Sequence, residues 1–502
     1  MDSLEWPTVD LLTHRARTTP GRTAIIDADR GQQFTFESFS SHVDDAAAGL
    51  DATEADRLGV LLETGPAFIC VLFAAMRTKK TIVPLSLRET PKELAMKIHR
   101  ADVEAIVCES ATESLATDIE GRPVWTVDTA GADGVESIHM HATADAVEPA
   151  VLEPDWPALI VFTSGTTGEP KGVKLTLRNL VASATASAFR LGVTRADRWL
   201  VPLPMYHLGG ISPVIRSTLY GTTVVTQREF VPAATADTIE SLECTGVSLV
   251  PTMIRKLLDA GWQPPETLRF ALVGGAPAEE SLVERSLIEG VPIYPTYGTT
   301  ETASQIATAT PNQVAARPGT VGRPLLGTTV TICDESGRPL EPGESGQIAV
   351  SGPTVCAGYL DDEQTDAARC EHGFLTGDVG HLDEEGRLWL ADRASDEIVT
   401  GGENVDPAEV RDVLEHHPSI AAAAVVGVPD EQWGESVGAL LVPSDPENPP
   451  TSADVLAHCD EHLAGYKRPR IIDLDEEIPR TVSGTVDRAE IRARLQLHGV
   501  QW

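Results

Sequence analysis

The sequence has little positive charge and very little lysine. Its 502 residues include 39 basic residues against 75 acidic ones, a formal net charge of -36. Only eight residues are lysines, at positions 79, 80, 92, 97, 171, 174, 256 and 467. The acidic residues are spread along the whole chain, so we interpret the excess as a surface property, typical of proteins from a salty, halophilic cytoplasm where screening weakens self-repulsion. The same charge argues against nucleic acid or an anionic membrane as a partner.

Cysteine pairs and long apolar runs are also absent from the sequence. The seven cysteines are scattered and contain no C-x-x-C, which predicts neither a disulfide framework nor a zinc site. No run of eighteen apolar residues occurs, and the first residues show no basic start followed by an apolar core. We therefore expect a cytoplasmic protein without membrane insertion, and the sequence leaves open whether it forms a homo-oligomer.

Short apolar runs alternate with helix-like stretches over about the first 320 residues. Examples of the runs are 57–63, 81–86, 158–165 and 269–275, and the stretch 66–78 is helix-like. This alternation predicts an α/β fold of layered, mostly parallel, buried strands. A chain of this length is too long for one compact core, so we expect two or more domains.

The pattern changes twice in the remainder of the chain. From about 320 to 392, short strands separated by Gly-rich turns predict a small antiparallel β module. From 397 to 502, two helix-like segments around a strand-like one predict a small α+β domain. We therefore expect an N-terminal domain over 1–392 and a C-terminal domain over 397–502, joined by the segment 393–396.

The strongest local motif is TSGTTGEPKGV, from Thr163 to Val173, directly after the apolar run ALIVF. Free backbone N–H groups and hydroxyls can surround an anion while Lys171 neutralises it, so the motif predicts a phosphate-binding loop. It is not a P-loop, because Pro170 replaces the second glycine and Gly172 follows the lysine. The candidate nucleotide-binding residues here are Thr163, Ser164, Gly165, Thr166, Thr167, Gly168 and Lys171.

This loop resembles the phosphate loop of the adenylate-forming enzymes, which include acyl-CoA synthetases, peptide-synthetase adenylation domains and luciferases. Five further segments appear in that family's order: PLPMYHLGG (202–210), VGGAP (273–277), YGTTETASQ (297–305), TGDVG (376–380) and DRASDEIVTGGENVDPAEV (392–410). The resemblance covers nearly the whole chain. It implies a large N-terminal domain and a mobile small C-terminal domain.

The resemblance also implies which residues bind ATP and its magnesium ion. Glu301 is expected to hold Mg²⁺, which prefers oxygen ligands. Asp378 and Arg393 are the implied ribose contacts. The implied adenine and phosphate contacts are Gly274, Gly275, Ala276, Tyr297, Gly298 and Thr300, and the implied catalytic residues are Lys171, His207, Thr300 and Glu301.

In such enzymes a carboxylate attacks the α-phosphorus of ATP to give acyl-AMP and pyrophosphate, and the thiol of coenzyme A then displaces AMP. No protein nucleophile is required, so catalysis consists of positioning and of stabilising phosphate charge. Two reactions in one site need a hinge. By the resemblance its pivot is Ser395, and Gly401 and Gly402 line the tunnel for coenzyme A.

Within the family, the runs 207–230 and 302–311 most resemble the o-succinylbenzoate-CoA ligases of menaquinone biosynthesis. That substrate keeps a second carboxylate, which needs a cation or several donors when buried. Arg216 is the candidate cation, with Ser304 and Gln305 as further hydrogen-bond partners and His207 beside the acyl group. Arg216 on a solvated helix face remains an alternative. So does another aryl or medium-chain acid bound in an apolar pocket.

One residue departs from the family pattern. The segment IPRTVSGTVDR (478–488) matches P-R-T-x-S-G-K except that Thr485 stands where the family has a lysine that contacts the α-phosphate during adenylation. Three interpretations stay open. Another cation substitutes, such as Lys467, Arg488 or a potassium ion; adenylation is slow while thioester formation proceeds; or the protein binds acyl-adenylate or nucleotide without turnover.

Overall fold

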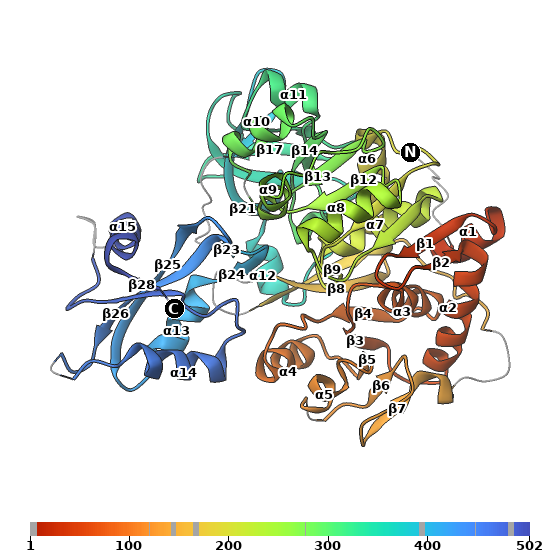
Figure 1. The fold of residues 1–502 in the computed structure, drawn as a ribbon, viewed down its shortest axis with the longest axis horizontal. Helices are drawn as coiled ribbons and strands as arrows, with labels where there is room; N and C mark the ends of the chain where they lie inside the picture. The colour runs from red at the N-terminus through yellow and green to blue at the C-terminus, as the bar shows by residue number, and fades with distance from the viewer. Residues whose placement is uncertain are drawn as a thin grey trace. The chain divides into compact units, whose positions relative to one another are not determined.

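The computed structural model describes residues 8–119, 121–141, 147–163, 170–276, 278–390, 397–446, 448–479 and 486–501. The chain divides into two compact units (Figure 1). The first takes residues up to 87 with 98–161 and 172–392, and the second takes 88–97, 162–171 and 393–502. Two short stretches of the predicted N-terminal domain, 88–97 and 162–171, belong to the second unit. The predicted domain boundaries therefore stay a prediction.

A run of parallel strands forms the centre of the first unit. In spatial order these are β1 (Thr23–Asp27), β11 (Thr223–Thr226), β10 (Arg198–Val201), β12 (Gly246–Leu249), β13 (Phe270–Val273) and β14 (Ile293–Tyr297). Each neighbouring pair is parallel, so all carboxyl ends lie at one edge. The helices that connect or cover them are α6 (Leu177–Leu191), α7 (Leu208–Tyr220), α8 (Pro232–Ser241), α9 (Pro251–Asp259) and α10 (Glu280–Ile288).

Successive residues of β10 point to opposite faces of this sheet. Trp199 and Val201 join a core that includes residues of α6 and α7, whereas Leu200 joins a core built with α8, α9 and α10. Both faces of β10 are therefore buried, which explains why the strands at the centre of this sheet are rich in apolar residues. The predicted α/β layering is confirmed.

Beyond β14 the same sheet becomes antiparallel. It continues through β15 (Ala307–Thr308), β16 (Thr320–Pro324), β22 (Leu388–Leu390), β21 (Gly373–Leu382), β18 (Gly346–Ser351) and β17 (Thr329–Cys333), with β20 (Arg369–Cys370) on β21. At the other end β2 (Gln32–Thr35) pairs antiparallel with β1. This confirms the predicted antiparallel module, which is continuous with the parallel strands and not separate from them.

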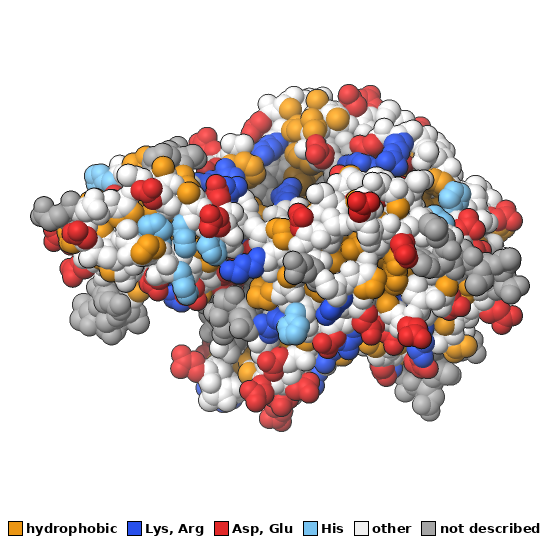
Figure 2. Space-filling model, turned by 90° about the horizontal axis from the view of Figure 1, so that it is seen from below, with side chains coloured by type: hydrophobic (Ala, Val, Ile, Leu, Met, Phe, Trp, Pro, Cys, Tyr) orange, Lys and Arg blue, Asp and Glu red, His pale blue; other side chains and the backbone are white. Residues whose placement is uncertain are grey.

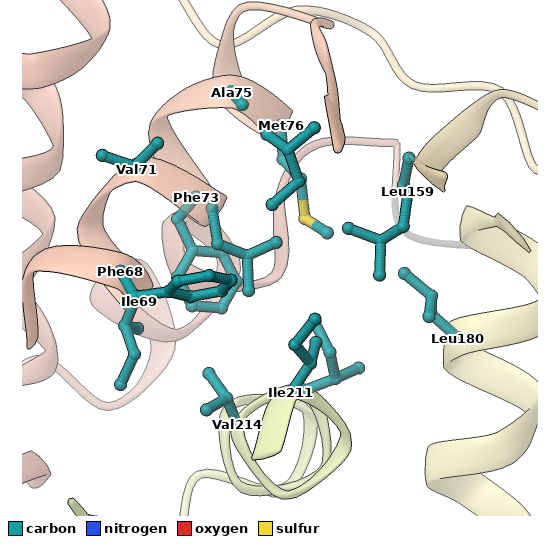
Figure 3. Close-up of a cluster of buried hydrophobic side chains, with 14 of the residues drawn as sticks. Phe68, Ile69, Val71, Phe73, Ala75, Met76, Leu159, Leu180, Ile211 and Val214 are labelled. Atoms are coloured by element: carbon teal, nitrogen blue, oxygen red, sulfur yellow. The ribbon is translucent and has the colours of Figure 1, made fainter. Parts of the chain in front are cut away.

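A second sheet has the order β19 (Gly358–Tyr359), β9 (Lys171–Thr176), β8 (Pro157–Thr163), β4 (Thr81–Pro84), β3 (Arg57–Leu61), β5 (Ala105–Cys108), β6 (Val124–Thr126) and β7 (Val135–Ser137). Figure 3 shows how α3 (Pro66–Arg77) joins this sheet to the first: Phe73 and Met76 face Leu159 of β8 and Ile211 of α7. The other described elements of this part are α1 (Leu11–Thr18), α2 (Phe36–Asp51), α4 (Pro91–Arg100), α5 (Glu113–Thr117), η1 (Ile138–His141), α11 (Pro311–Ala316) and α12 (Asp362–Ala367).

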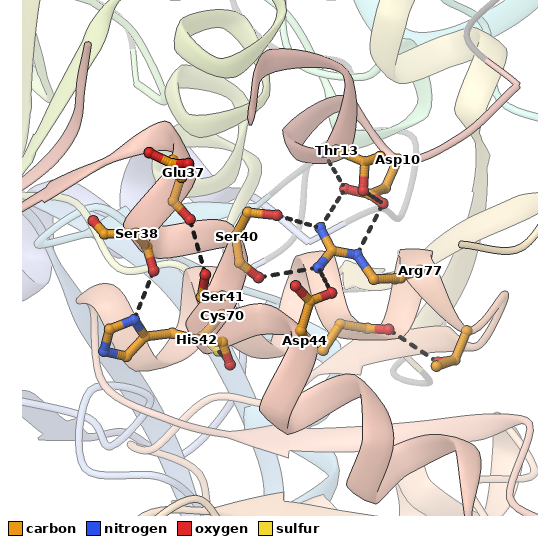
Figure 4. A network of polar contacts seen from close by, with 12 residues as sticks. Asp10, Thr13, Glu37, Ser38, Ser40, Ser41, His42, Asp44, Cys70 and Arg77 are labelled. Atoms are coloured by element: carbon orange, nitrogen blue, oxygen red, sulfur yellow. Dashed lines mark hydrogen bonds and ion pairs between the residues drawn. The ribbon is translucent and has the colours of Figure 1, made fainter. Parts of the chain in front are cut away.

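A buried arginine ties three N-terminal helices together (Figure 4). Arg77 of α3 is 1% exposed, and its Nε lies 3.2 Å from Oδ2 of Asp10, just before α1. Its NH1 lies 2.6 Å from Oδ1 of Asp44 and also donates to the carbonyl of Ser40, both in α2. A buried charge is tolerated when it is paired and hydrogen-bonded, as here.

The second unit contains a sheet of order β24 (Glu403–Val405), β23 (Ile398–Thr400), β26 (Gly434–Pro443), β27 (Ile471–Leu474) and β28 (Val500–Gln501), with β25 (Ile420–Asp430) on β26. Val437, Ala439 and Leu441 of β26 face a core with α13 (Pro407–Glu415) and α14 (Ser452–His462). Leu440 faces the other way, toward α15 (Arg488–His498). The predicted α+β character of this region is confirmed.

Acidic side chains lie scattered over the face drawn in Figure 2 and do not gather in one patch. This distribution agrees with the interpretation of the acidic excess as a property of the surface and not of one binding site. Among the residues that the structure describes, no helix combines the length and apolar character that crossing a membrane requires.

Candidate active site

Three of the predicted motifs follow neighbouring or nearby strands of one parallel sheet. His207 follows β10, the pair Gly274 and Gly275 follows β13, and Tyr297 is the last residue of β14. The strand order places β10, β12, β13 and β14 side by side, so these segments meet at the carboxyl edge. That edge is where open α/β sheets bind ligands.

Tyr297 and Asp378, predicted as separate nucleotide contacts, touch each other. The Tyr297 hydroxyl donates to Oδ2 of Asp378 over 2.7 Å, and the Thr376 hydroxyl lies 3.0 Å from the Tyr297 oxygen. Tyr297 comes from the end of β14 and the other two residues from β21, so the antiparallel half of the sheet returns beside the parallel half. Tyr297 and Asp378 are each 7% exposed.

Glu301 lies in the short 3₁₀ turn η2 (Thr300–Thr302) after β14 and is half-buried. Its Oε1 accepts a hydrogen bond of 2.9 Å from the hydroxyl of Tyr359, and its backbone carbonyl accepts one of 2.7 Å from the N–H of Cys356. Tyr359 is not among the residues predicted from the sequence. The only sequence signal near it is an apolar Gly-Tyr step in CAGYL, which does not indicate a partner nearly sixty residues away.

The turn after β14 has a backbone that few residues can adopt. A Cβ on Gly298 would collide with the carbonyl oxygen of Ser304, which explains the glycine at that position. Ala303 and Ser304 have φ of 53° and 106°, in the left-handed region that non-glycine residues rarely occupy. Such strain often occurs at ligand sites.

His207 precedes the first turn of α7 and is half-buried. Its backbone carbonyl accepts hydrogen bonds from the N–H groups of Gly210 and Ile211, which starts the helix. Its ring lies edge-on to the ring of Tyr206, with centroids 4.7 Å apart. The position of the ring is therefore set by the end of β10 and the start of α7.

Arg216 of α7 is buried and has no carboxylate partner among the described residues. It is 2% exposed, its NH2 lies 3.2 Å from the Ser304 hydroxyl, and its guanidinium carbon lies 5.4 Å from the ring centre of Trp199. Its Nε donates no hydrogen bond to any described atom. Burial lowers the pKa of the Arg216 guanidinium to about 9. The alternative of a solvated helix face is wrong.

The surroundings of Arg216 differ from those of another buried arginine, Arg77. Both arginines are buried, but Arg77 is held by two carboxylates, whereas Arg216 has one hydroxyl and one aromatic ring. A buried cation without a carboxylate partner is unfavourable unless an anion pairs with it.

Gln305 is buried beside this region, but its donors are engaged. Its Nε2 lies 2.8 Å from the Thr308 hydroxyl and 3.1 Å from the Thr296 hydroxyl, and its Oε1 has no hydrogen bond among the described atoms. The structure thus brings Ser304, and not Gln305, into contact with Arg216. The role of Gln305 toward a substrate stays a prediction.

The phosphate loop itself lies largely outside the described residues. Thr163 ends β8 and Lys171 begins β9, and these strands are adjacent in the second sheet. The predicted contacts Ser164, Gly165, Thr166, Thr167 and Gly168 fall within 164–169, which the structure does not describe. Arg393, the pivot Ser395 and Thr485 likewise lie outside the described residues.

Gly401 and Gly402 form the turn between β23 and β24 in the second unit. Their φ angles are 61° and 88°, which favour glycine, and the N–H of Gly401 donates to the carbonyl of Trp433. A Cβ on Gly401 would lie 2.8 Å from the Trp433 ring. The backbone of this loop is therefore held by Trp433.

Lys467, considered above as a substitute cation, is engaged elsewhere in the second unit. Its Nζ lies 2.6 Å from Oε1 of Glu93 and 2.8 Å from Oε1 of Glu409, and it is 5% exposed. Burial opposes ionisation of both carboxyls. At Glu93 the Lys467 charge and two bonds from Thr90 outweigh burial and lower the pKa, whereas at Glu409 burial outweighs the same cation and raises the pKa.

The fold and these sites define an adenylate-forming enzyme. Residues 12–360 match the family described as AMP-binding enzyme, and residues 409–485 match the AMP-binding enzyme C-terminal domain. The chain belongs to this family.

Its relatives narrow the class further. The chain is 36% identical to the 2-succinylbenzoate–CoA ligase of Bacillus pumilus over 96% of this chain and 97% of that protein. Among solved structures, a double mutant of o-succinylbenzoate CoA synthetase from Bacillus subtilis bound with its product analogue has a TM-score of 0.88 at 33% identity, covering 96% and 98% of the two chains. The same enzyme in complex with ATP and magnesium ion has a TM-score of 0.73 at 32% identity, covering 96% and 99%. An amide bond synthetase from Marinactinospora thermotolerans has a TM-score of 0.88 at 31% identity, covering 96% and 99%.

Proposed function

We propose that this protein is an acid–thiol ligase that converts 2-succinylbenzoate, ATP and coenzyme A to 2-succinylbenzoyl-CoA, AMP and diphosphate in menaquinone biosynthesis. The observation that carries the choice of substrate is Arg216, a buried cation with no carboxylate partner among the described residues. The names of the relatives support the same substrate.

A diacid suits Arg216 for an electrostatic reason. Holding an unpaired guanidinium in the interior is unfavourable by several kcal/mol, and a substrate carboxylate beside it relieves that penalty through a charge-assisted hydrogen bond. The free Nε–H and the NH2 group shared with the Ser304 hydroxyl are available as donors. A monoacid without the second carboxylate would leave the cation unpaired, so the site should discriminate strongly against it.

The residues around Glu301 fit a magnesium ion carried by ATP. Among the described residues, no group of three His, Cys, Asp or Glu side chains could hold a metal ion. Mg²⁺ usually takes only one or two carboxylates together with phosphate oxygens, so Glu301 is a sufficient protein ligand. When bound, the ion neutralises phosphate charge.

The chain's own residues then act by binding and orientation. In our proposal Tyr297 and Asp378, joined by their 2.7 Å hydrogen bond, hold the nucleoside, and Lys171 and Thr300 bind phosphate oxygens. His207 lies beside the acyl group. In the first step the substrate carboxylate oxygen bonds to the α-phosphorus and pyrophosphate leaves. In the second, the thiol sulfur bonds to the acyl carbon, AMP leaves with the former carboxylate oxygen, and the thiol proton passes to solvent.

The decisive experiment compares two acids that differ in one carboxylate. 3-Benzoylpropionate has the succinyl chain of 2-succinylbenzoate without the carboxylate on the ring. We expect kcat/KM for CoA-dependent AMP formation to be about 100-fold higher for the diacid. Arg216→Met should lose most of that preference, and Ser304→Ala should lose less of it because the cation remains. Equal use of both acids by the natural protein would show that the substrate is wrong.

Binding without turnover is a second candidate, because Thr485 replaces the family's lysine. In that case 2-succinylbenzoyl-AMP would raise the melting temperature of the protein, while neither ATP–pyrophosphate exchange nor thioester would be detected.

A further inference from the structure

Tyr359 lies where three separate parts of the first unit meet. It belongs to β19, whose two residues pair antiparallel with β9 in the registers Gly358–Lys174 and Tyr359–Val173. The N–H of Ala357 donates to the carbonyl of Lys174, and the N–H of Leu360 donates to the carbonyl of Gly172. β9 is the strand that leaves the predicted phosphate loop, so the backbone around Tyr359 is fastened to the exit of that loop.

The Tyr359 side chain points to a different element. Its hydroxyl donates to Oε1 of Glu301 over 2.9 Å, and the adjoining Cys356 N–H donates to the carbonyl of Glu301 over 2.7 Å. The turn that carries Glu301 is therefore held twice, once through its main chain and once through its carboxylate. The second carboxylate oxygen of Glu301, Oε2, accepts no hydrogen bond from any described residue.

The ring of Tyr359 is itself immobilised. It is 5% exposed and lies edge-on to Phe374, with ring centroids 5.6 Å apart, and its backbone N–H donates to the Thr365 hydroxyl over 2.9 Å. Packing of the ring thus fixes the position of the Tyr359 hydroxyl, and the hydrogen bond from that hydroxyl fixes the position of the Glu301 carboxylate. Outer hydrogen-bond partners of this kind orient metal-binding carboxylates and raise metal affinity.

We propose that Tyr359 is the positioning residue for the magnesium-binding carboxylate. Its hydroxyl holds one oxygen of Glu301 so that the other oxygen faces the nucleotide's cation. Because Tyr359 is paired with β9, it also fixes the position of that carboxylate relative to the strand that leaves the phosphate loop. This inference rests on the proposed function, since it assumes that nucleotide binds with its cation at Glu301.

The test uses Tyr359→Phe in the full-length protein, because this change removes the hydroxyl and keeps the ring against Phe374. Binding of Mn²⁺ is followed by electron paramagnetic resonance in the presence of α,β-methylene ATP, which needs no turnover. We expect the apparent Mn²⁺ affinity to fall about 10-fold and the Mg²⁺ concentration for half-maximal ATP–pyrophosphate exchange to rise by a similar factor, while the melting temperature changes little. Glu301→Gln should weaken Mn²⁺ binding more strongly.

Tyr294→Phe is the matched control. Tyr294 lies in the same strand as Tyr297 and is half-buried, and no role in nucleotide binding is assigned to it. The Tyr294→Phe variant should bind Mn²⁺ as the natural protein does. The proposal is overturned if Tyr359→Phe binds Mn²⁺ within twofold of the natural protein, if Glu301→Gln retains full Mn²⁺ affinity, or if exchange falls only together with the melting temperature. A natural protein inactive toward 2-succinylbenzoate in which Tyr359→Phe still weakens Mn²⁺ binding would refute the substrate and support this inference.

Discussion

Lys467 and Glu93, 374 residues apart, form a buried ion pair of 2.6 Å in the second unit. The same ammonium also binds Glu409. Its charge is therefore shared between two carboxylates, and removing it would leave both uncompensated. Lys467 is thus poorly suited to be the substitute cation that was an open interpretation of Thr485, because its charge is already paired.

Lys467→Met should destabilise the second unit. Breaking a buried ion pair from one side typically costs about 3 kcal/mol, because the remaining charges stay buried without a partner. Urea unfolding followed by circular dichroism measures the loss. Lys79→Met is the control, since the pair of Lys79 with Glu153 is exposed and should contribute nothing measurable. Equal behaviour of the two variants would show that the Lys467 pairs are not formed in solution.

Arg216→Met should make the unliganded protein more stable, although it damages the substrate site. Replacing a buried, unpaired charge by an apolar side chain of similar length removes its desolvation penalty, and we expect a gain of about 1 to 3 kcal/mol. Thermal unfolding without substrate checks this. The gain should disappear when saturating 2-succinylbenzoate is present, because the diacid stabilises only the protein that keeps the arginine.

The affinity for 2-succinylbenzoate should fall at alkaline pH. Burial lowers the pKa of Arg216 to about 9 from 12.5, so the folded, unliganded protein holds this proton less tightly than the unfolded chain. Below about pH 9 the cation is present and the dissociation constant should be flat. Above it the constant should rise tenfold for each pH unit, because a carboxylate binds the protonated form. Calorimetry between pH 7 and 10 tests this, and Arg216→Met should show no such rise.

Thr485→Lys should accelerate only the first half-reaction. A lysine reaching the α-phosphate adds a charge-assisted contact to the developing oxyanion, and loss of such a donor typically costs about 100-fold in rate. We expect a rise of about that size in ATP–pyrophosphate exchange with 2-succinylbenzoate, and less than about a twofold change in thioester formation from preformed acyl-AMP. If ATP–pyrophosphate exchange is already fast in the natural protein in high KCl and does not rise in the variant, another cation stabilises the phosphate charge during adenylation.

High salt should stabilise the protein. The formal charge of -36 makes the carboxylates repel one another, and the Debye length falls from about 10 Å at 0.1 M to about 3 Å at 1 M salt. The melting temperature should therefore rise as KCl increases from 0.1 M to 2 M. A melting temperature independent of salt would contradict the halophilic interpretation of the composition.

The parts predicted well from the sequence depend on local patterns. Short apolar runs such as those of β8 and β13 indicate buried parallel strands, and the Gly-rich turns after residue 320 indicate an antiparallel module; both are confirmed. The motifs at 207, 274 and 297 are recognisable from their residues, and VGGAP (273–277) also from its place at the end of an apolar run. The structure adds the strand order, which is what makes these motifs neighbours.

The missed features depend on partners far apart in the sequence. Tyr359 contacts Glu301, and Glu93 contacts Lys467, yet no periodicity or spacing relates the two members of either pair. Tyr297 and Asp378 were both assigned to the nucleotide, but not to each other. Only the return of the antiparallel strands beside β14 brings their side chains within hydrogen-bonding distance.

The sequence by itself determined the family, the order of the motifs, the excess of acidic residues and the threonine at position 485, because these are properties of residue identity. It placed an arginine at 216 but could not say whether that arginine was solvated. Only the tertiary structure decided that it is buried against Trp199 and Ser304, with no carboxylate partner among the residues that the structure describes. Burial is set by which distant segments pack together, and no local pattern around position 216 records it.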